Sequence, residues 1–230
     1  MNYAFPPQPQ PGIPVLGTDL VFPVHRIYCI GRNYADHARE MGARIDRGQP
    51  VFFSKPADAV VSGSEVRYPP ATSELHHEVE MIVALASGGR DIRVEDALGC
   101  VFGYGVGLDL TRRDLQARAK QNGTPWDTAK GFDESAPVSA LTPLAACGHP
   151  REAALSLRVN GELRQHSDIR EMVFSVAEII HELSKLYDLC AGDLIFTGTP
   201  AGVAALQPDD RFEAALGDIA ALSGRIVVSS

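Results

Sequence analysis

SELHHEVEM, residues 73–81, carries three carboxylates and two histidines directly before the apolar run IVAL at 82–85. Side chains on a β-strand alternate between its two faces, so Glu78 and Glu80 share one face with His76, while the other face is mainly apolar. The pattern predicts a strand over HHEVEMIVALA, residues 76–86. Burying unpaired charge is costly, so the acids at the start of this strand need a partner or solvent.

A metal ion is one such partner. Residues i and i+2 of a strand have Cα atoms about 6.5–7 Å apart, so Glu78 and Glu80 can converge on one cation. A solvated acidic face explains the same alternation equally well. Asp109, in VFGYGVGLDLTRRD at 101–114, is the candidate third ligand, although an acid just before a helix is an ordinary feature. Three carboxylates suit Mg²⁺ or Mn²⁺, whereas zinc favours His or Cys.

The composition is that of an ordinary globular protein, with 45% hydrophobic and 22% charged residues among 230 and a formal net charge of -8. No Lys/Arg-rich block is present, which argues against a nucleic-acid partner. No apolar run is long enough to span a membrane, and MNYAFPPQPQPGIP at 1–14 lacks the basic and apolar regions of a signal peptide. We expect a cytoplasmic protein.

The chain is expected to fold as one α+β, strand-rich domain over residues 18–230. A Pro- and Gln-rich extended arm over 1–17 precedes it and is expected to lie outside the core. Expected strands lie near 24–30, 50–56, 65–70, 76–86, 155–167 (a hairpin), 191–203 (a strand with a glycine turn) and 225–228. Expected helices are 32–42, 94–102, 112–122 and 175–187.

Local signals fix some turns and helix ends. Asn160-Gly161 between alternating segments predicts a type I′ hairpin turn. Thr111 with Asp114, and Ser175 with Glu178, fit capping boxes, and Gly123 suits a helix stop. GYGVG at 103–107 has GxGxG rather than GxGxxG spacing, so close backbone approach is a better interpretation than dinucleotide binding.

GRNYADHARE, residues 31–40, offers His37 and Glu40, which are neighbours on one face of a helix. A histidine oriented by a carboxylate can take a proton from water, although an exposed surface pair is the more ordinary interpretation of this spacing alone. Lys130 in PWDTAKGFD and Thr199 in FTGTP lie among small, turn-forming residues, where a single Lys or Thr indicates little by itself.

Taken together, these segments resemble one family. GRNYADHARE, FFSKP, HHEVE, GLDLTRRDLQ, PWDTAKGFD, VNGE followed by RQ, and GDLIFTGTPAGV are similar in order and spacing to the fumarylacetoacetate hydrolase superfamily over about residues 25–228. The chain is most similar to the short single-domain members, which include acylpyruvate hydrolases, fumarylpyruvate hydrolases and oxaloacetate decarboxylases. Small departures occur at two turn positions, Ala191 and Ala204, where the family commonly has Pro and Gly.

The resemblance implies a β-rich fold, a mixed β-roll or sandwich of the fumarylacetoacetate hydrolase type, usually in a homodimer. It places the ligands of one Mg²⁺ or Mn²⁺ ion per site on Glu78, Glu80 and Asp109. His37 and Glu40 match a water-activating pair on a mobile lid helix, and Lys130 matches the active-site lysine. Substrate-binding positions fall on Arg32, Arg113, Gln116 and Thr199.

The implied reaction is metal-dependent hydrolysis of a C–C bond in a 2,4-dioxo acid. His37, held by Glu40, takes a proton from water, hydroxide attacks the C4 carbonyl, Lys130 stabilises the oxyanion, and the C3–C4 bond breaks. Fumarylpyruvate, which gives fumarate and pyruvate in aromatic (gentisate) catabolism, is the first choice of substrate. Arg44 or Arg47 can bind the distal carboxylate of the fumaryl group, although both can equally be solvated loop arginines.

Two alternatives stay open. Decarboxylation or isomerisation of oxaloacetate or a related 2-oxo acid uses the same metal-stabilised enolate; Glu40→Ala is expected to abolish hydrolysis and spare decarboxylation. A binding or scaffold protein that has lost turnover is disfavoured, because every catalytic position holds a competent residue. Gly42 and Gly48 punctuate residues 36–48 and, with the family resemblance, predict a lid that closes over substrate.

Overall fold

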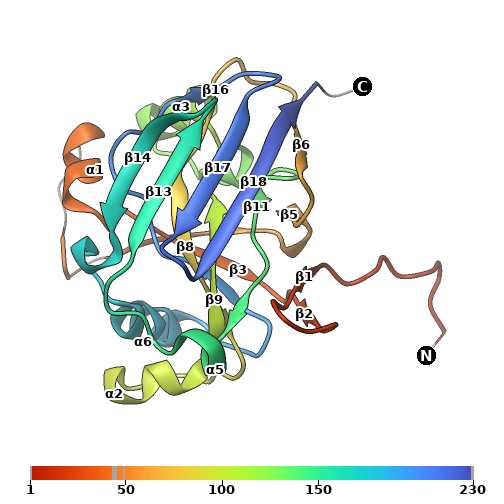
Figure 1. Ribbon diagram of the computed structural model, residues 1–230, viewed down its shortest axis with the longest axis vertical. Helices are drawn as coiled ribbons and strands as arrows, with labels where there is room; N and C mark the ends of the chain where they lie inside the picture. Colours follow the sequence, from red (N-terminus) through yellow and green to blue (C-terminus); the bar gives the residue numbers. More distant parts are fainter. Residues whose placement is uncertain (1, 43–45, 49, 229–230) are drawn as a thin grey trace.

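A six-stranded mixed sheet forms the centre of the computed structural model, which describes residues 2–42, 46–48 and 50–228 (Figure 1). The strand order is β12-β9-β8-β15-β3-β4. These strands span Thr142–Pro143 (β12), Val101–Leu108 (β9), Val79–Leu85 (β8), Leu194–Phe196 (β15), Ile27–Gly31 (β3) and Val51–Lys55 (β4). Only β15 and β3 run parallel; the other neighbours are antiparallel.

A five-stranded sheet, in the order β14-β13-β17-β18-β6, covers one face of the central sheet. It consists of Glu162–Asp168 (β14), Ala154–Val159 (β13), Arg211–Leu216 (β17), Ala220–Val227 (β18) and Glu65–Arg67 (β6). The main core joins Met81 and Val83 of β8 to Leu157 and Phe212 of this sheet. The two layers make the strand-rich α+β fold that the sequence predicts.

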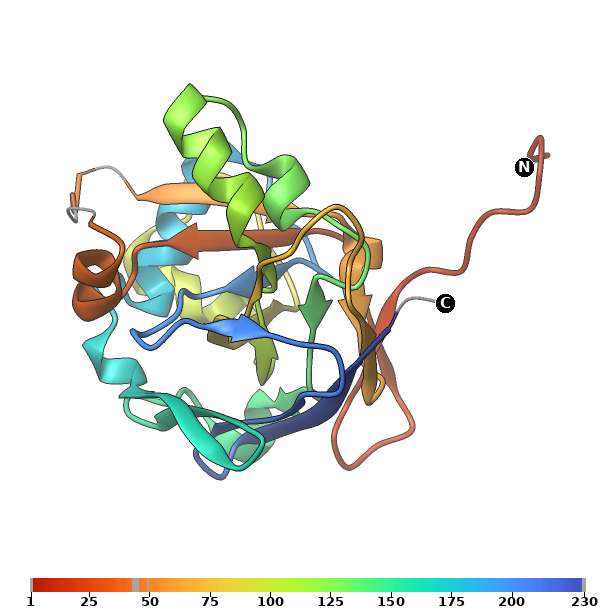
Figure 2. The same cartoon turned by 90° about the horizontal axis from the view of Figure 1, so that it is seen from above.

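The other face of the central sheet is covered near the N-terminus. Gly12–Pro14 (β1) and Val21–Pro23 (β2) form an antiparallel hairpin there. Ile13 and Val15 are buried in a second core with Ile82, because alternation in this hairpin points both side chains inward. The prediction that residues 1–17 stay outside the core is therefore wrong for these two. The described residues before β1, 2–11, lead away from the body without forming a helix or strand (Figures 1 and 2).

Short elements complete the fold. The remaining strands are Val60–Val61 (β5), Leu75–His76 (β7), Thr111–Arg112 (β10), Ala136–Pro137 (β11) and Ala205–Leu206 (β16). The α-helices are Ala35–Glu40 (α1), Val94–Ala97 (α2), Arg113–Asn122 (α3), Asp127–Lys130 (α4), Leu144–Cys147 (α5) and Val176–Leu186 (α6). The 3₁₀ turns are Ala57–Ala59, Leu98–Cys100 and Ile169–Glu171. Throughout the described ranges, no helix combines the length and apolar character needed to cross a membrane.

Strand β8 confirms the predicted alternation of side chains between two faces, but the strand begins later than predicted. Met81 and Val83 enter the main core, whereas Ile82 and Ala84 enter the second core. The single strand predicted over 76–86 is broken, since β7 ends at His76 and β8 begins at Val79. Both faces of β8 are buried, so a solvated acidic face does not exist here.

Several turn predictions are confirmed. Asn160 and Gly161 both have positive φ, as a type I′ turn requires, and Gly123 ends α3 in the left-handed conformation. Close backbone approach also explains Gly103, where a Cβ would lie 2.3 Å from the Thr142 carbonyl oxygen. The capping box of Ser175 and Glu178 is present at the start of α6.

Two local predictions are wrong. Thr111 does not cap α3, because its hydroxyl donates to the Asp109 carbonyl and Asp114 instead accepts from the Thr72 hydroxyl. The helix expected over 94–102 shortens to α2 and a 3₁₀ turn, because Val101 already belongs to β9.

Candidate active site

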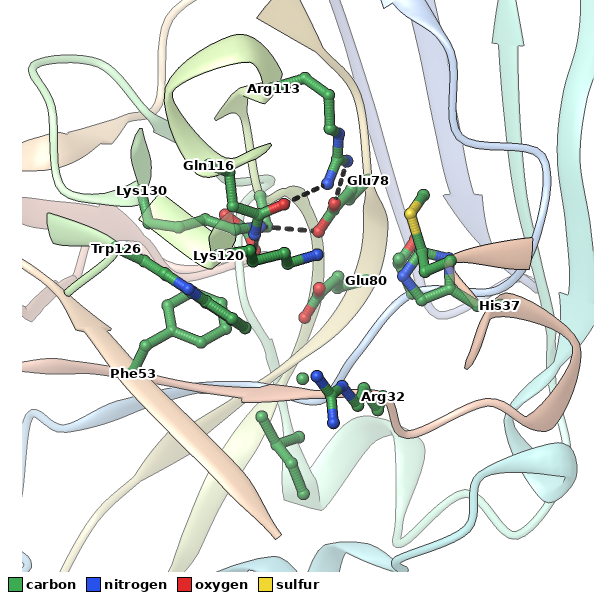
Figure 3. A pocket seen from close by; sticks show the side chains of 15 residues that line it. Arg32, His37, Phe53, Glu78, Glu80, Arg113, Gln116, Lys120, Trp126 and Lys130 are labelled. Carbon is green, nitrogen blue, oxygen red and sulfur yellow. Dashed lines mark hydrogen bonds and ion pairs between the residues drawn. The ribbon is translucent and has the colours of Figure 1, made fainter. Parts of the chain in front are cut away.

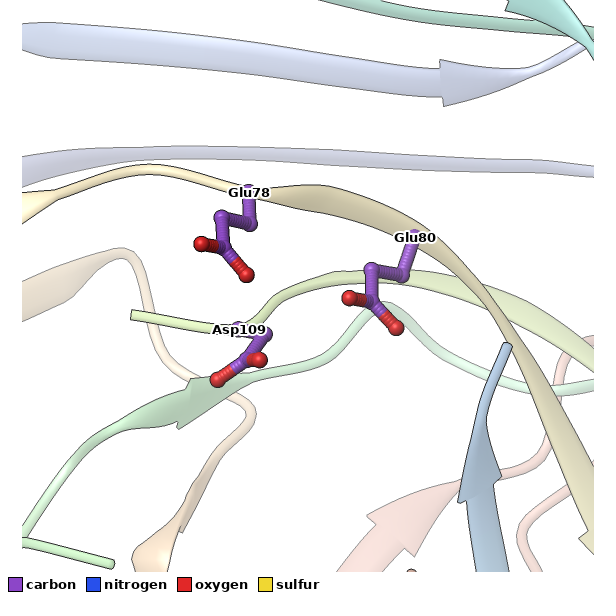
Figure 4. A group of neighbouring side chains, drawn as sticks. All are labelled: Glu78, Glu80 and Asp109. Atoms are coloured by element: carbon purple, nitrogen blue, oxygen red, sulfur yellow. The ribbon is translucent and has the colours of Figure 1, made fainter. Parts of the chain in front are cut away.

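Three carboxylates converge where β8 begins and β9 ends (Figure 4). Pairing of these strands brings Asp109 beside Glu78, and the Asp109 amide donates to the Glu78 carbonyl over 2.9 Å. Glu78, Glu80 and Asp109 are all buried, and each offers an oxygen within 4.8 Å of the others. Carboxylates at this separation repel one another, so the cluster is suited to binding a cation.

Three cationic side chains already contact two of these acids. Lys55 lies 2.8 Å from Asp109, Lys130 lies 2.8 Å from Glu78 and also bonds to Asp109, and the Arg113 guanidinium pairs with Glu78. Burial alone would raise the pKa of Glu78, but Lys130 and Arg113 outweigh it and hold that pKa below its ordinary value. Burial likewise tends to lower the pKa of Lys130, yet Asp109 and Glu78 raise it, so Lys130 is an ammonium ion.

Glu80 differs from the other two acids. Its carboxylate accepts from the Gly198 amide at 2.7 Å and, within the described ranges, forms no ion pair with a cationic side chain. Burial, with the charges of Asp109 and Glu78, raises the pKa of Glu80 well above its ordinary value. A divalent cation bound between the three carboxylates would give Glu80 the cationic partner that it does not have among the described side chains. Because all three ligands are hard oxygen donors, the residues present fit Mg²⁺ or Mn²⁺.

His37 lies on helix α1 at the edge of the same pocket (Figure 3). Its Nδ1 is 3.3 Å from Glu40, and Glu40 also accepts from the Gly202 amide at 3.1 Å. With Nδ1–H donating to Glu40, Nε2 carries the free lone pair. Burial lowers the pKa of His37, despite the opposing effects of Glu78 and Glu40, so the imidazole is neutral near pH 7.

One pocket joins nearly all the residues singled out from the sequence (Figure 3). The pocket is lined by Arg32, His37, Glu78, Glu80, Asp109, Arg113, Gln116, Lys130 and Thr199, while Glu40 bonds to His37 without lining it. Gln116 accepts from Arg113 at 2.6 Å, which leaves its amide N–H groups for a ligand. Thr199 accepts from Gln165 at 2.8 Å, which leaves its hydroxyl hydrogen to donate.

Comparison with known proteins decides the family. The sequence model of the fumarylacetoacetate (FAA) hydrolase C-terminal family matches residues 26–227. The chain belongs to the fumarylacetoacetate hydrolase family.

Solved and curated members of this family are similar over most of their length. The structure of fumarylpyruvate hydrolase from Pseudomonas aeruginosa in complex with Mn²⁺ and pyruvate has a TM-score of 0.96 and 48% identity, covering 99% of this chain and 100% of that one. The mitochondrial oxaloacetate tautomerase of Rattus norvegicus is 42% identical over 87% of this chain and 90% of its own. An oxaloacetate tautomerase of Escherichia coli (strain K12) is 41% identical over 84% and 89%.

Family membership and the acidic triad together identify a metal-dependent enzyme of the fumarylacetoacetate hydrolase family whose cofactor is Mg²⁺ or Mn²⁺. The donor set consists only of carboxylates, as these hard cations prefer.

Arg47 does not have the position that the sequence hypothesis gave it. Its guanidinium lies 2.7 Å from Glu178 at the start of α6 and 5.5 Å from the Phe174 ring centre, and it does not line the pocket. It therefore connects residues 46–48 to the start of α6. Arg44 lies outside the described residues, so its part of the hypothesis is untested.

Arg47→Ala is consequently expected to raise KM for fumarylpyruvate and for acetylpyruvate by the same small factor, less than about threefold, because an exposed ion pair contributes little. Steady-state kinetics with both substrates measure this. An increase confined to fumarylpyruvate would restore the original hypothesis of a contact between Arg47 and the distal carboxylate.

Sequence reasoning missed two lysines of this region. Lys55 ends β4, is buried, and also donates to the Leu110 carbonyl at 3.2 Å. The sequence signal that could have identified Lys55 was the position of a lysine at the end of an otherwise mostly apolar strand. Lys120 lines the pocket from α3, and its spacing from Arg113 and Gln116 places all three on one helix face.

Proposed function

We propose that the enzyme hydrolyses the C3–C4 bond of a 2,4-dioxo acid, with fumarylpyruvate as the preferred substrate. The observation that carries this proposal is the pairing of buried His37 with the more exposed Glu40 at the edge of the pocket that holds the carboxylate triad. A neutral histidine oriented by a carboxylate is suited to take a proton from water. The full-length similarity to the P. aeruginosa fumarylpyruvate hydrolase supports the choice of acyl group.

In the proposed reaction, His37 Nε2 takes a proton from water and the resulting hydroxide adds to the C4 carbonyl. Lys130 uses two of its three ammonium donors on Glu78 and Asp109, and the third is available to the developing C4 oxyanion. The C3–C4 bond then breaks, its electron pair passes to C3, and reprotonation gives one carboxylic acid and pyruvate. A divalent ion held by Glu78, Glu80 and Asp109 would supply Lewis acidity for the enolate charge.

The remaining pocket residues are proposed to orient the substrate. Arg113, the Gln116 amide and the Thr199 hydroxyl present donors to the carboxylate and oxo groups of the pyruvyl half, and Arg32 offers a further guanidinium to the substrate. Anionic oxygens bind strongly to charged donors, and fixed donors lower the entropic cost of orientation.

The direct test follows the ultraviolet absorbance of fumarylpyruvate with purified protein and Mg²⁺ or Mn²⁺. The proposal expects loss of absorbance, equal amounts of fumarate and pyruvate, and complete inhibition by EDTA. Stable fumarylpyruvate in the metal-loaded protein would contradict it, as would loss of absorbance without pyruvate.

The decrease of kcat/KM at acid pH, the acid limb of the profile, should follow the protonation of His37. Burial lowers the pKa of this residue below its ordinary value of 6.5, Glu78 and Glu40 raise it, and Arg113 lowers it. Protonation removes the base, so kcat/KM should fall only below pH 6.5. Glu40→Gln removes a contribution that raises the pKa, so the limb should move to lower pH while kcat drops. A limb that stays in place in this variant would show that His37 is not the titrating base.

Tautomerisation of oxaloacetate is the second candidate, because the curated relatives at 41–42% identity have that activity in their names. In this reaction His37 Nε2 would remove a proton from C3 of oxaloacetate, from the same position in which it would take a proton from water during hydrolysis. The same pocket therefore supports both reactions, and the rates on the two substrates distinguish them.

The cellular setting is a further part of the proposal. The family resemblance suggests a cytoplasmic homodimer that acts in aromatic (gentisate) catabolism. Light scattering of the purified protein measures the mass, and a value equal to the 24.7 kDa chain would contradict the dimer.

A further inference from the structure

Two cations of the active-site pocket have no carboxylate partner among the described residues. Lys130 and Arg113 are paired with Glu78 or Asp109. Arg32 and Lys120 also line the pocket, but neither forms an ion pair anywhere in residues 2–42, 46–48 and 50–228. An unpaired cation in a partly enclosed pocket can form charge-assisted hydrogen bonds with an anionic group of a ligand.

Lys120 is held toward the pocket by its helix and by an aromatic ring. Arg113, Gln116 and Lys120 follow i, i+3, i+7 spacing on α3, which puts all three on the pocket face. The Lys120 ammonium lies 5.3 Å from the Trp126 ring centre, a cation–π contact that leaves its N–H donors free. In Figure 3 the side chain extends into the space between Trp126 and His37.

Arg32 has an unusual backbone that supports a role in binding. Its φ is +61°, a left-handed conformation that costs free energy in a residue other than glycine. The adjacent Asn33 side chain stabilises this turn, because its amide donates to the Phe174 and Thr197 carbonyls at 3.0 and 2.8 Å. The neighbouring structure thus maintains the conformation that places Arg32 at the pocket.

We propose that Lys120, together with Arg32, binds the carboxylate at the far end of a dicarboxylate substrate and so makes the enzyme prefer acyl groups that end in a carboxylate. The inference rests on the proposed function, since it names the substrate class of that site. Desolvation and the charge of Arg113 lower the pKa of Lys120, Glu78 raises it, and Arg32 and Lys130 lower it further; an incoming carboxylate offsets the repulsion by the three cations. The pyruvyl half does not require Lys120, because Arg113 and the metal site are proposed to bind it.

The kinetic test compares fumarylpyruvate with acetylpyruvate, which lacks the distal carboxylate. Lys120→Met should raise KM for fumarylpyruvate about tenfold and change KM for acetylpyruvate less than about twofold, because only the first substrate loses a charge-assisted contact. Lys120→Arg should recover most of the loss. Arg118→Met is the matched control, since Arg118 is an exposed cation on the same helix that does not line the pocket.

If Lys120→Met raises KM equally for both substrates, the inference is overturned. It is also overturned if Arg118→Met raises KM for fumarylpyruvate as much as Lys120→Met does, because the effect would then come from long-range charge alone. A binding measurement separates this failure from failure of the proposed reaction. Calorimetry of the Mn²⁺-loaded protein should show fumarate binding more tightly than crotonate, which has a methyl group in place of one carboxylate. Lys120→Met should remove that preference even if the parent protein hydrolyses neither dioxo acid, and a preference unchanged in the variant would refute the inference.

Discussion

Glu80→Gln is expected to lower kcat/KM at least about 1,000-fold without destabilising the metal-free protein. The triad loses a ligand charge, and loss of Lewis acidity removes several kcal/mol of transition-state stabilisation. Glutamine has the shape of a protonated glutamic acid and can still accept from the Gly198 amide, which lies 2.7 Å from Glu80. The variant therefore separates metal binding from folding.

The stability of this variant has a definite dependence on pH. Burial, Asp109 and Glu78 raise the folded-state pKa of Glu80 above its ordinary value of 4.5. The folded parent thus binds more protons than the unfolded chain above pH 4.5, and its stability in EDTA falls as pH rises through that window. Glutamine does not titrate, so the stability of Glu80→Gln relative to the parent should increase with pH.

Urea unfolding in EDTA and calorimetric titration with Mn²⁺ measure the two effects. Glu74→Gln is the matched control, because Glu74 is an exposed acid of the same stretch. Retention of activity by Glu80→Gln would exclude Glu80 as a ligand. A loss of more than about 2 kcal/mol in EDTA would contradict the charge argument, because glutamine preserves the hydrogen bond that this carboxylate accepts from the Gly198 amide.

Asp109→Ala should have the opposite signature, a loss of about 3–5 kcal/mol in the free energy of unfolding. The Lys55 side chain is 0% exposed and that of Lys130 is 2% exposed, and both contact this carboxylate. Removing Asp109 leaves Lys55 as a buried cation without an ion-pair partner in the described structure. Such a charge is destabilising even where no metal is bound.

A double-mutant cycle tests the cause of that loss. Lys55→Met in the Asp109→Ala background removes the orphaned charge, so the double variant should be more stable than the sum of the single effects predicts. Urea unfolding in EDTA gives the three free energies. A loss below about 1.5 kcal/mol for Asp109→Ala, or strict additivity in the double variant, would show that the ion pair is not the determinant.

Local patterns indicated which side chains could lie together, and the family resemblance supplied their expected roles. Strand alternation pairs Glu78 with Glu80 and helix spacing pairs His37 with Glu40, but each pattern alone fits an exposed surface at least as well. Asp109 could only be a candidate, because its place beside Glu78 depends on the register between β8 and β9. That register is a tertiary property.

The errors have the same origin. The local sequence predicts Thr111 as a helix cap, but β10 pairs with β7 and the Thr111 hydroxyl donates to the Asp109 carbonyl. Ile13 and Val15 lie in a Pro-rich segment, yet pairing with β2 buries them. Lys55 and Lys120 gain meaning only when distant segments meet, because a single lysine in a strand or helix carries little local signal.

The proposed reaction of this pocket is the cleavage of C–C bonds in acylpyruvates. It is tested most directly by measuring kcat/KM for fumarylpyruvate hydrolysis and for oxaloacetate tautomerisation in one Mn²⁺-loaded preparation, with His37→Gln assayed beside it. The account predicts that hydrolysis is the faster reaction, that fumarate and pyruvate appear in equal amounts, and that His37→Gln abolishes it. Stable fumarylpyruvate together with rapid, metal-dependent tautomerisation of oxaloacetate would contradict the account and assign the pocket to the second reaction.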